Sequence, residues 1–155
     1  MEETVITKRI DIKPYKSMYE YRQANRLEEH GVSFLYENEH LSFLSKVVNG
    51  ECAACDSKIV GKRREYTPDF YFPKVDIFVE TKGKFTSEAR TKFLEIVEQT
   101  SWDLRIVFMT DNYLTKKHGM RYSRWCELNN IKYAIGDIPL SWVEESSEND
   151  SINSS

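Results

Sequence analysis

The sequence predicts an α/β (α+β) protein in which a mixed β-sheet is flanked by helices. A helix-like segment comes first, and several strand-like segments follow it. Helix-like and strand-like segments then alternate toward the C-terminus. At 155 residues the chain is long enough to bury one core and too short for two substantial ones. The sequence therefore predicts one domain with one site.

The first predicted helix covers residues 18–29. Ser17 and Glu20 have the spacing of a capping box, and Gly31 provides a stop signal after the helix. The capping box alone would explain why a glutamate stands at position 20. Its spacing to Ala24 and Leu27 also places it on the side of the helix that would face the sheet. A capping role and a role near a metal are therefore compatible for Glu20.

Three strands are predicted to follow the helix. The first covers residues 32–43, and the second covers about 59–72 with a break near 62–64. The segment near 45–58 between them is predicted to be an insertion or a long loop. A third strand covers residues 77–82. The four residues that separate it from the second strand are typical of a hairpin connection.

The second half of the chain predicts alternating helices and strands. A hydroxyl cap at Thr86 begins a helix, and residues 104–109 are apolar enough for a central strand. The apolar side of this helix is formed by Ala89, Phe93, Ile96 and Val97.

A loop at residues 110–119 is predicted to lead into a helix at about 120–129. We expect this helix to bury Trp125, Leu128 and the thiol of Cys126. Residues 133–135 are predicted to form the last strand, and Pro139 with Trp142 would close the fold.

The composition of the chain and of its two terminal segments indicates the class of protein. A single domain is predicted at residues 1–143, and the Ser-, Asn- and acid-rich residues 144–155 are predicted to be a disordered tail. No apolar run is long enough to span a membrane, and the N-terminus lacks the layout of a secretory signal. We expect a cytoplasmic protein that does not contact membranes.

Cys52 and Cys55 form a Cys-x-x-Cys pair, which is half of a zinc site. No second cysteine pair follows, so His40 or cysteines of a partner chain would have to complete four ligands. Zn²⁺ is one interpretation. A plain loop is the favoured alternative, and redox or disulfide chemistry is a third.

The net charge of −3 is distributed unevenly along the chain. Residues 137–155 carry five acidic side chains and no Lys or Arg, whereas residues 58–92 carry nine basic and five acidic ones. Local basic patches matter more for phosphate binding than the overall sum. The charge pattern is therefore compatible with a nucleic-acid partner, and equally with ordinary solvated surface.

The predicted hairpin brings together the chemically informative residues. If Phe72 pairs with Ile77, Asp69 lies directly opposite Glu80, where Cβ atoms are about 4.5–5.5 Å apart and two like charges destabilise a sheet. A divalent cation between the carboxylates would offset this repulsion, and oxygen ligands of this kind suit Mg²⁺. Lys82 falls on the same strand face as Glu80.

The amino-acid sequence of these two strands narrows the interpretation of the three residues. For an Asp, a Glu and a Lys on neighbouring strands in general, the alternative to a metal site is an exposed polar strand face on which Lys82 neutralises Asp69 and Glu80. However, Thr67-Pro68-Asp69-Phe70 followed by Val79-Glu80-Thr81-Lys82-Gly83 resembles the PD-(D/E)XK nuclease superfamily, in which Pro-Asp precedes an acid-x-Lys strand. The resemblance implies a restriction-endonuclease-like core.

The chain from about Ser17 to Trp142 also resembles the bacteriophage endonuclease I family, which resolves Holliday junctions. The matching segments are Glu20 in a helix ending at Glu29-His30-Gly31-Val32, Tyr66-Thr67-Pro68-Asp69-Phe70, Phe78-Val79-Glu80-Thr81-Lys82-Gly83, Leu104-Arg105-Ile106-Val107-Phe108, Trp125-Cys126-Glu127, Ile131-Lys132-Tyr133-Ala134 and Ile138-Pro139-Leu140-Ser141-Trp142.

This resemblance implies a magnesium-dependent endodeoxyribonuclease in which Mn²⁺ can substitute for Mg²⁺. It implies Glu20, Asp69, Glu80 and Lys82 as the catalytic set, with metal held mainly by Asp69 and Glu80. The carboxylates would place one or two ions against the scissile phosphate. Lys82 would orient or deprotonate the attacking water, or offset charge on the phosphate, and the sequence does not choose between these roles.

The resemblance also implies partners: branched DNA and a second copy of the chain, in a phage-infected host's cytoplasm. The family's dimer exchanges segments, so that a site takes its helix glutamate from the partner chain; here the lengthened segment around Cys52 leaves the exchange open. Family members can carry a basic C-terminal end, which this chain lacks. The candidates for its DNA contacts are Lys62, Arg63, Arg64, Lys84, Arg90, Lys92, Lys116, Lys117, Arg121 and Arg124.

Two other functions remain as alternatives. One is a nicking or homing-type endonuclease that is directed to a duplex sequence, for which the Cys-x-x-Cys segment would supply base contacts. The other is a non-catalytic DNA-binding protein. The second is weakened because all four candidate catalytic positions carry suitable residues.

Overall fold

The computed structural model describes residues 11–45, 61–115 and 119–144. Its elements in chain order are α1 (Met18–Glu29), β1 (Leu35–Tyr36), β2 (Leu41–Ser45), β3 (Lys62–Tyr66), β4 (Phe70–Phe72), β5 (Ile77–Lys82), α2 (Ser87–Gln99), β6 (Asp103–Phe108), α3 (Tyr122–Leu128), β7 (Tyr133–Ile135) and α4 (Leu140–Val143).

A mixed five-stranded sheet forms the centre, with strand order β1-β4-β5-β6-β7. The strands β1, β4 and β5 pair antiparallel, and β6 and β7 continue the sheet parallel to β5. Parallel neighbours need a crossover connection, which α2 and α3 provide between β5, β6 and β7. The predicted α+β class with a mixed sheet flanked by helices is confirmed.

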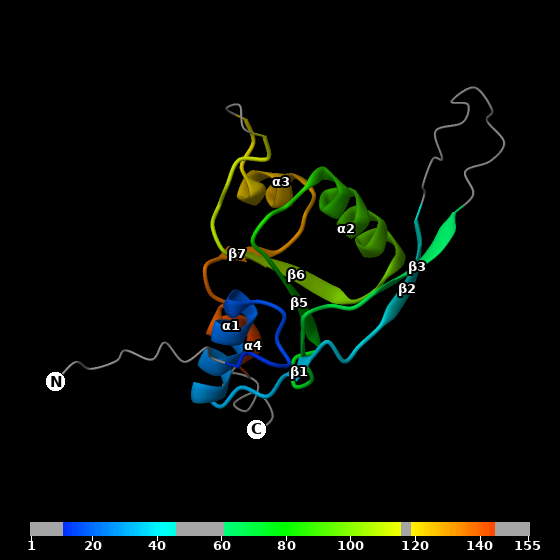
Figure 1. Ribbon diagram of the computed structural model, residues 1–155. Coiled ribbons are helices and arrows are strands. Elements are labelled where there is room, and N and C mark those ends of the chain that lie inside the picture. The colour runs from blue at the N-terminus through cyan, green and yellow to red at the C-terminus, as the bar shows by residue number, and fades with distance from the viewer. Residues whose placement is uncertain (1–10, 46–60, 116–118, 145–155) are drawn as a thin grey trace, which may run out of the picture.

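Helices cover both faces of this sheet, with α2 and α3 on one side and α1 and α4 on the other (Figure 1). Each face has its own core. One core includes Phe78, Phe93, Ile96, Phe108 and Cys126. The other core includes Ala24, Leu27, Phe70, Phe72, Val79 and Ile138. The alternation of residues along β5 therefore supplies both layers.

The helix α1 begins and ends where the sequence predicts. Its N-cap Ser17 accepts a hydrogen bond from the backbone N–H of Glu20. Side-chain bonds tie the helix to the C-terminal segment: Gln23 Nε2 donates to Asp137 at 2.8 Å, and the backbone N–H of Ile138 donates to Gln23 at 2.9 Å. These bonds fix the face of α1 that carries Glu20 against the sheet.

The single strand predicted at residues 32–43 is wrong. Two strands occupy this region, β1 in the main sheet and β2 in a separate two-stranded sheet with β3. The chain turns between them at Glu37, whose φ of 45° lies in the left-handed region that strands do not use. The N–H of Glu37 donates to the carbonyl of Asp69 at 2.9 Å instead of continuing the ladder.

The break in the second predicted strand is also misplaced. Residues 62–64 lie inside β3, where they pair with β2. The interruption comes instead at residues 67–69, between β3 and β4. Pro68 has no N–H for a ladder bond, so the break follows from its chemistry.

The hairpin, the strands that follow it and the helix after Thr86 are confirmed. Phe72 pairs with Ile77, Tyr71 with Phe78 and Phe70 with Val79. The Thr86 side chain accepts from the N–H of Ala89 at the start of α2, and the strands β6 and β7 fall within about a residue of their predicted ranges. Gln99, in the last turn of α2, ties the β2–β3 ribbon to the body through two 2.7 Å bonds to the backbone of Leu44.

The helix predicted at residues 120–129 is shorter and turned differently. In α3, Tyr122 and Cys126 are buried, whereas Leu128 is 53% exposed. Residues four apart share a helix face, so Tyr122 and Cys126 face the sheet and Leu128 cannot join them. The prediction that Leu128 is buried is wrong, and the one for Cys126 is confirmed.

Several predictions fall on residues that lie outside the described ranges. These are most of the segment near 45–58 with Cys52 and Cys55, the basic residues Lys116 and Lys117, and nearly all of the predicted tail at 144–155. In the described part of the chain, no helix is long and apolar enough to cross a membrane.

Candidate active site

Asp69 lies in the break between β3 and β4 and is buried. Its Oδ2 accepts hydrogen bonds from the backbone N–H of Thr81 at 2.8 Å and from the Thr81 hydroxyl at 2.7 Å. The paired ladder ends at Phe70 with Val79, so Asp69 stands one residue beyond it. The predicted register is confirmed, but the ladder does not include the direct pairing of Asp69 with Glu80.

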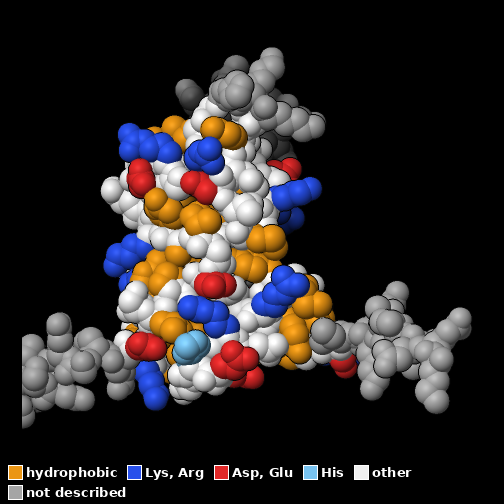
Figure 2. Space-filling view, turned by 90° about the vertical axis from the view of Figure 1, so that its left-hand side faces the viewer, with side chains coloured by type: hydrophobic (Ala, Val, Ile, Leu, Met, Phe, Trp, Pro, Cys, Tyr) orange, Lys and Arg blue, Asp and Glu red, His pale blue; other side chains and the backbone are white. Residues whose placement is uncertain are grey.

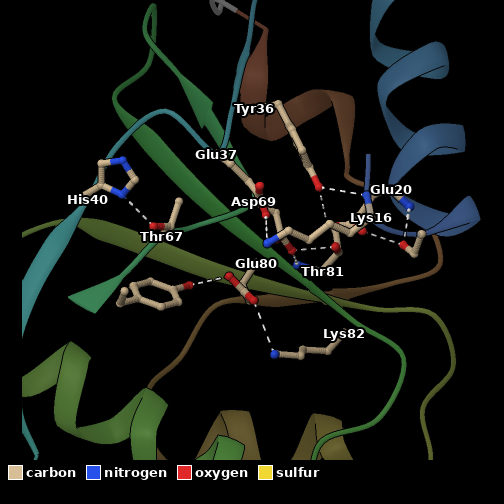
Figure 3. A network of polar contacts seen from close by, with 12 residues as sticks. Lys16, Glu20, Tyr36, Glu37, His40, Thr67, Asp69, Glu80, Thr81 and Lys82 are labelled. Carbon is tan, nitrogen blue, oxygen red and sulfur yellow. Dashed lines mark hydrogen bonds and ion pairs between the residues drawn. The ribbon is translucent and has the colours of Figure 1, made fainter. Parts of the chain in front are cut away.

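Three carboxylates gather around this position. Glu20, Glu37 and Asp69 each offer an oxygen within 4.8 Å of the other two (Figure 3). They come from α1, from the turn after β1 and from the break before β4. The sequence predicted two members of this group, and Glu37 is an addition.

Glu20 is held at both oxygens. The Ser17 hydroxyl donates to Oε2 at 2.6 Å, and the Tyr36 hydroxyl donates to Oε1 at 3.0 Å. The Ser17 hydroxyl also accepts from the backbone N–H of Glu20. The helix cap therefore orients the carboxylate, so that Glu20 takes part in capping and in the acidic group at once.

Glu37 reaches the group because of its backbone conformation. A positive φ is uncommon for a residue with a β-carbon and concentrates at functional sites. The bond from its N–H to the carbonyl of Asp69 holds the two residues together. Glu37 lies outside the motifs that identify Asp69 and Glu80, and no local pattern in the sequence marks its turn.

The surroundings of Asp69 disfavour its charged form. The pKa of Asp69 is raised to about 8: burial contributes most to the rise, the carboxylates of Glu80 and Glu20 add to it, and the bonds from Thr81 oppose it. A bound cation would therefore favour the charged form of Asp69. Three convergent carboxylates are the hard oxygen ligands that divalent cations such as Mg²⁺ and Ca²⁺ prefer, so the donor set fits such an ion.

Glu80 lies on β5 next to this group and has different partners. The Tyr66 hydroxyl donates to Glu80 Oε2 at 2.5 Å, and the Lys82 ammonium lies 3.4 Å from Oε1. Burial raises the pKa of Glu80, whereas Lys82 and the bond from Tyr66 lower it. Lys82 is about one-third exposed (32%), so its ammonium is accessible from outside.

A surface hollow of about 590 Å³ opens beside Lys82. The residues that line it are Arg64, Glu65, Lys82, Thr86, Glu88, Ala89 and Lys92. A second hollow of about 430 Å³ shares Arg64, Glu88 and Lys92 with it. Two of the predicted DNA-binding residues, Arg64 and Lys92, are thus brought next to the candidate catalytic lysine.

The other predicted DNA-binding residues within the described ranges do not line these two hollows. Arg90 donates to the carbonyl of Phe85, Arg121 donates to the carbonyl of Asp111, and Arg124 forms an ion pair with Glu127. Lys62, Arg63 and Lys84 are exposed. On the face shown in Figure 2, Lys and Arg side chains are interspersed with acidic and hydrophobic ones and form no continuous patch.

Of the possible zinc ligands, His40 lies within the described residues. His40 Nδ1 lies 2.7 Å from the Thr67 hydroxyl, in the segment next to Asp69 (Figure 3). The proposed zinc ligands Cys52 and Cys55 lie outside the described residues. Burial raises the pKa of the Cys126 thiol to about 12, which is typical of an inert structural cysteine.

An α+β sheet with a group of convergent carboxylates, and with a Glu-x-Lys strand beside it, defines a nuclease-like protein. The chain belongs to the Phage endonuclease I family, whose sequence profile matches residues 1–154. It is 35% identical over 133 residues to Endonuclease I of Escherichia phage T7, covering 84% of this chain and 79% of that protein. It is 33% identical over 133 residues to Endodeoxyribonuclease 1 of Enterobacteria phage T3, covering 84% and 78%.

Proposed function

We propose that the chain is a metal-dependent DNA endonuclease that is selective for structure and resolves Holliday junctions and other branched DNA by phosphodiester hydrolysis. The observation that carries this proposal is the group of Glu20, Glu37 and Asp69 beside Glu80 and Lys82. Membership of the endonuclease family and the T3 relative's description as an endodeoxyribonuclease support the same class of reaction on DNA.

The proposed metal site combines Asp69 with Glu20, Glu37 and Glu80. Mg²⁺ is the proposed ion, with Mn²⁺ as a substitute. When bound, such an ion would supply positive charge to a phosphate and to its leaving oxygen. Asp69 is oriented for this task by Thr81, and Glu80 by Tyr66 and Lys82. The buried bonds to these carboxylates hold the ligand oxygens in place before DNA arrives.

Lys82 is proposed to act on the phosphate or on the attacking water. Its ammonium is held near Glu80 and borders the hollow that Arg64 and Lys92 also line. A phosphate entering this hollow would meet three basic side chains. We propose that one DNA strand passes along it, since phosphate contacts position DNA without reading its sequence.

The proposed assembly is a homodimer, because resolving a junction needs two cuts in two strands and therefore two sites. Glu20 and Asp69 of one chain meet in the acidic group. An exchange of α1 between two subunits would build the same group from two chains. Mixing a Glu20→Gln chain with an Asp69→Asn chain distinguishes these arrangements. Restored nicking indicates exchange, whereas continued inactivity indicates that each chain completes its own site.

The experiment that tests the function compares a labelled four-way junction with a linear duplex of matched sequence. Each is incubated with wild-type protein in Mg²⁺, in Mn²⁺ or in chelator. Cutting of the junction alone, in metal alone, is the expected result. Metal-dependent nicking of the linear duplex at a defined sequence would favour a sequence-directed endonuclease. Absence of cutting under every metal condition would favour a non-catalytic DNA-binding protein.

A further inference from the structure

The acidic group already has a positively charged neighbour in the chain itself. Lys16 directly precedes the N-cap Ser17, and its Nζ lies 2.7 Å from Glu37 Oε1. Figure 3 shows the Lys16 side chain running from the start of α1 across to Glu37 and Asp69. Within the described ranges, no other basic side chain has an ion pair with Glu20, Glu37 or Asp69.

The backbone of Lys16 is hydrogen-bonded to the group through Tyr36, and its side chain contacts the group through an exposed ion pair. The N–H of Lys16 donates to the Tyr36 hydroxyl at 3.2 Å, and that hydroxyl donates to Glu20 at 3.0 Å. The side chain itself is 73% exposed. The ammonium therefore lies at the group at the end of a solvent-exposed side chain, while the Lys16 backbone is held by Tyr36.

All three carboxylates attract this ammonium. Glu37 contributes most through direct contact, and the charges of Asp69 and Glu20 add to it. The three carboxylates lie within 4.8 Å of one another, which leaves room for one cation among them. A lysine ammonium and a divalent ion at that spot would repel each other strongly at such short separation.

We propose that Lys16 is the built-in counter-ion of the acidic group, and that a divalent cation binds by displacing its ammonium. This inference rests on the proposed metal site. Lys16 neutralises Glu37 in the metal-free protein and competes with the metal for the same oxygens. Its presence lowers the affinity of the group for divalent cations, and metal binding frees the Lys16 side chain.

The test measures Mn²⁺ binding to the DNA-free, full-length protein by calorimetry and by electron paramagnetic resonance of free Mn²⁺. Lys16→Met removes the charge and keeps much of the stem, Lys16→Arg retains the charge, and Lys13→Met removes a nearby exposed lysine. We expect Lys16→Met to bind Mn²⁺ about fivefold more tightly than wild type, the upper range for an exposed ion pair. Lys16→Arg and Lys13→Met should stay close to wild type.

The outcomes separate this inference from the proposed function. If wild type binds Mn²⁺ and Lys16→Met binds it with equal or lower affinity, the competition is disproved and the metal site stands. If Lys16→Met loses affinity for a four-way junction with no change in Mn²⁺ binding, Lys16 is a phosphate contact and the inference is wrong. If neither wild type nor Lys16→Met binds Mn²⁺, both the inference and the proposed metal site fail. Circular dichroism of each variant verifies folding.

Discussion

Asp69 and Thr81 are joined by two hydrogen bonds to the same carboxylate oxygen, 2.8 Å from the Thr81 nitrogen and 2.7 Å from its hydroxyl. Both end on Oδ2, so the other oxygen of Asp69 carries neither of them. The strand β5 thus contributes to the site in two ways: Glu80 is a candidate ligand, and its neighbour Thr81 orients a second one.

Replacing Thr81 by valine removes one of these bonds and preserves the shape of the side chain. We expect Thr81→Val to bind Mn²⁺ about tenfold more weakly than wild type, as is typical when a group that orients a ligand is lost. Thr81→Ser, which keeps the hydroxyl, should bind nearly as wild type does. Thr91→Val on the exposed side of α2 is the matched control. Equal affinity for Thr81→Val and wild type would show that Thr81 does not orient the site.

Tyr66 is expected to position Glu80. Tyr66→Phe removes the buried hydroxyl that donates to Glu80 and leaves the ring in the core. We expect junction cleavage to slow by about tenfold or more, since conserving the ring leaves only the orienting bond to be lost. Junction affinity in Ca²⁺ should remain unchanged. Tyr71→Phe, which loses an exposed bond to Asp76, is the control. Equal slowing in both variants would contradict a specific role.

The raised pKa of Asp69 predicts a dependence of stability on pH. A carboxyl whose pKa is higher in the folded chain favours folding while it is protonated. The contribution of Asp69 is therefore lost as the pH rises from its ordinary pKa of 3.8 to about 8. Across this pH range the melting temperature of the metal-free wild type should fall by more than that of Asp69→Asn.

Added Mg²⁺ should reverse this loss and should raise the melting temperature more at the alkaline end than at the acid end, because ligands must be deprotonated to bind metal. Thermal unfolding in chelator and in Mg²⁺ at a series of pH values measures both effects. Parallel pH curves for wild type and Asp69→Asn would contradict a raised pKa of the buried Asp69 carboxyl.

Glu37 is expected to matter for metal binding although no motif marks it. Glu37→Gln keeps the size of the side chain and removes one of the three convergent carboxylates. We expect Mn²⁺ affinity to fall by about tenfold, as for loss of a group in or around a metal site. Glu39→Gln, two residues along the same turn, is the control. Unchanged affinity in Glu37→Gln would limit the site to the other carboxylates.

The sequence predicts those parts of the fold in which local chemistry decides the outcome. The helix α1 follows from Ser17, Glu20 and Gly31, and the β4–β5 register follows from a four-residue turn. The boundary between β1 and β2 could not be predicted in this way. It depends on Glu37 taking a positive φ, which is held by a bond to Asp69 from a distant part of the chain.

The site likewise combines residues that a local pattern predicts with residues that only tertiary contacts bring in. The sequence predicts Asp69, Glu80 and Lys82 because their spacing on one hairpin is a local pattern. Tyr66 and Glu37 reach the site only through tertiary contacts. Tyr66 on β3 donates a hydrogen bond to Glu80 on β5, and Glu37 reaches the carboxylates from the turn after β1. For Leu128, helical periodicity left the orientation of a short helix undetermined, and the packing of Tyr122 and Cys126 decided it.

The most direct test of the account is the cleavage rate of a labelled four-way junction under single-turnover conditions, for wild type and Asp69→Asn. We expect wild type to cut in Mg²⁺ and not in chelator, and Asp69→Asn to cut at least about 100-fold more slowly, since a metal's charge stabilises the transition state by several kcal/mol. Both proteins should bind the junction similarly in Ca²⁺. Cutting by wild type in chelator, or cutting by Asp69→Asn at the wild-type rate, would contradict the account.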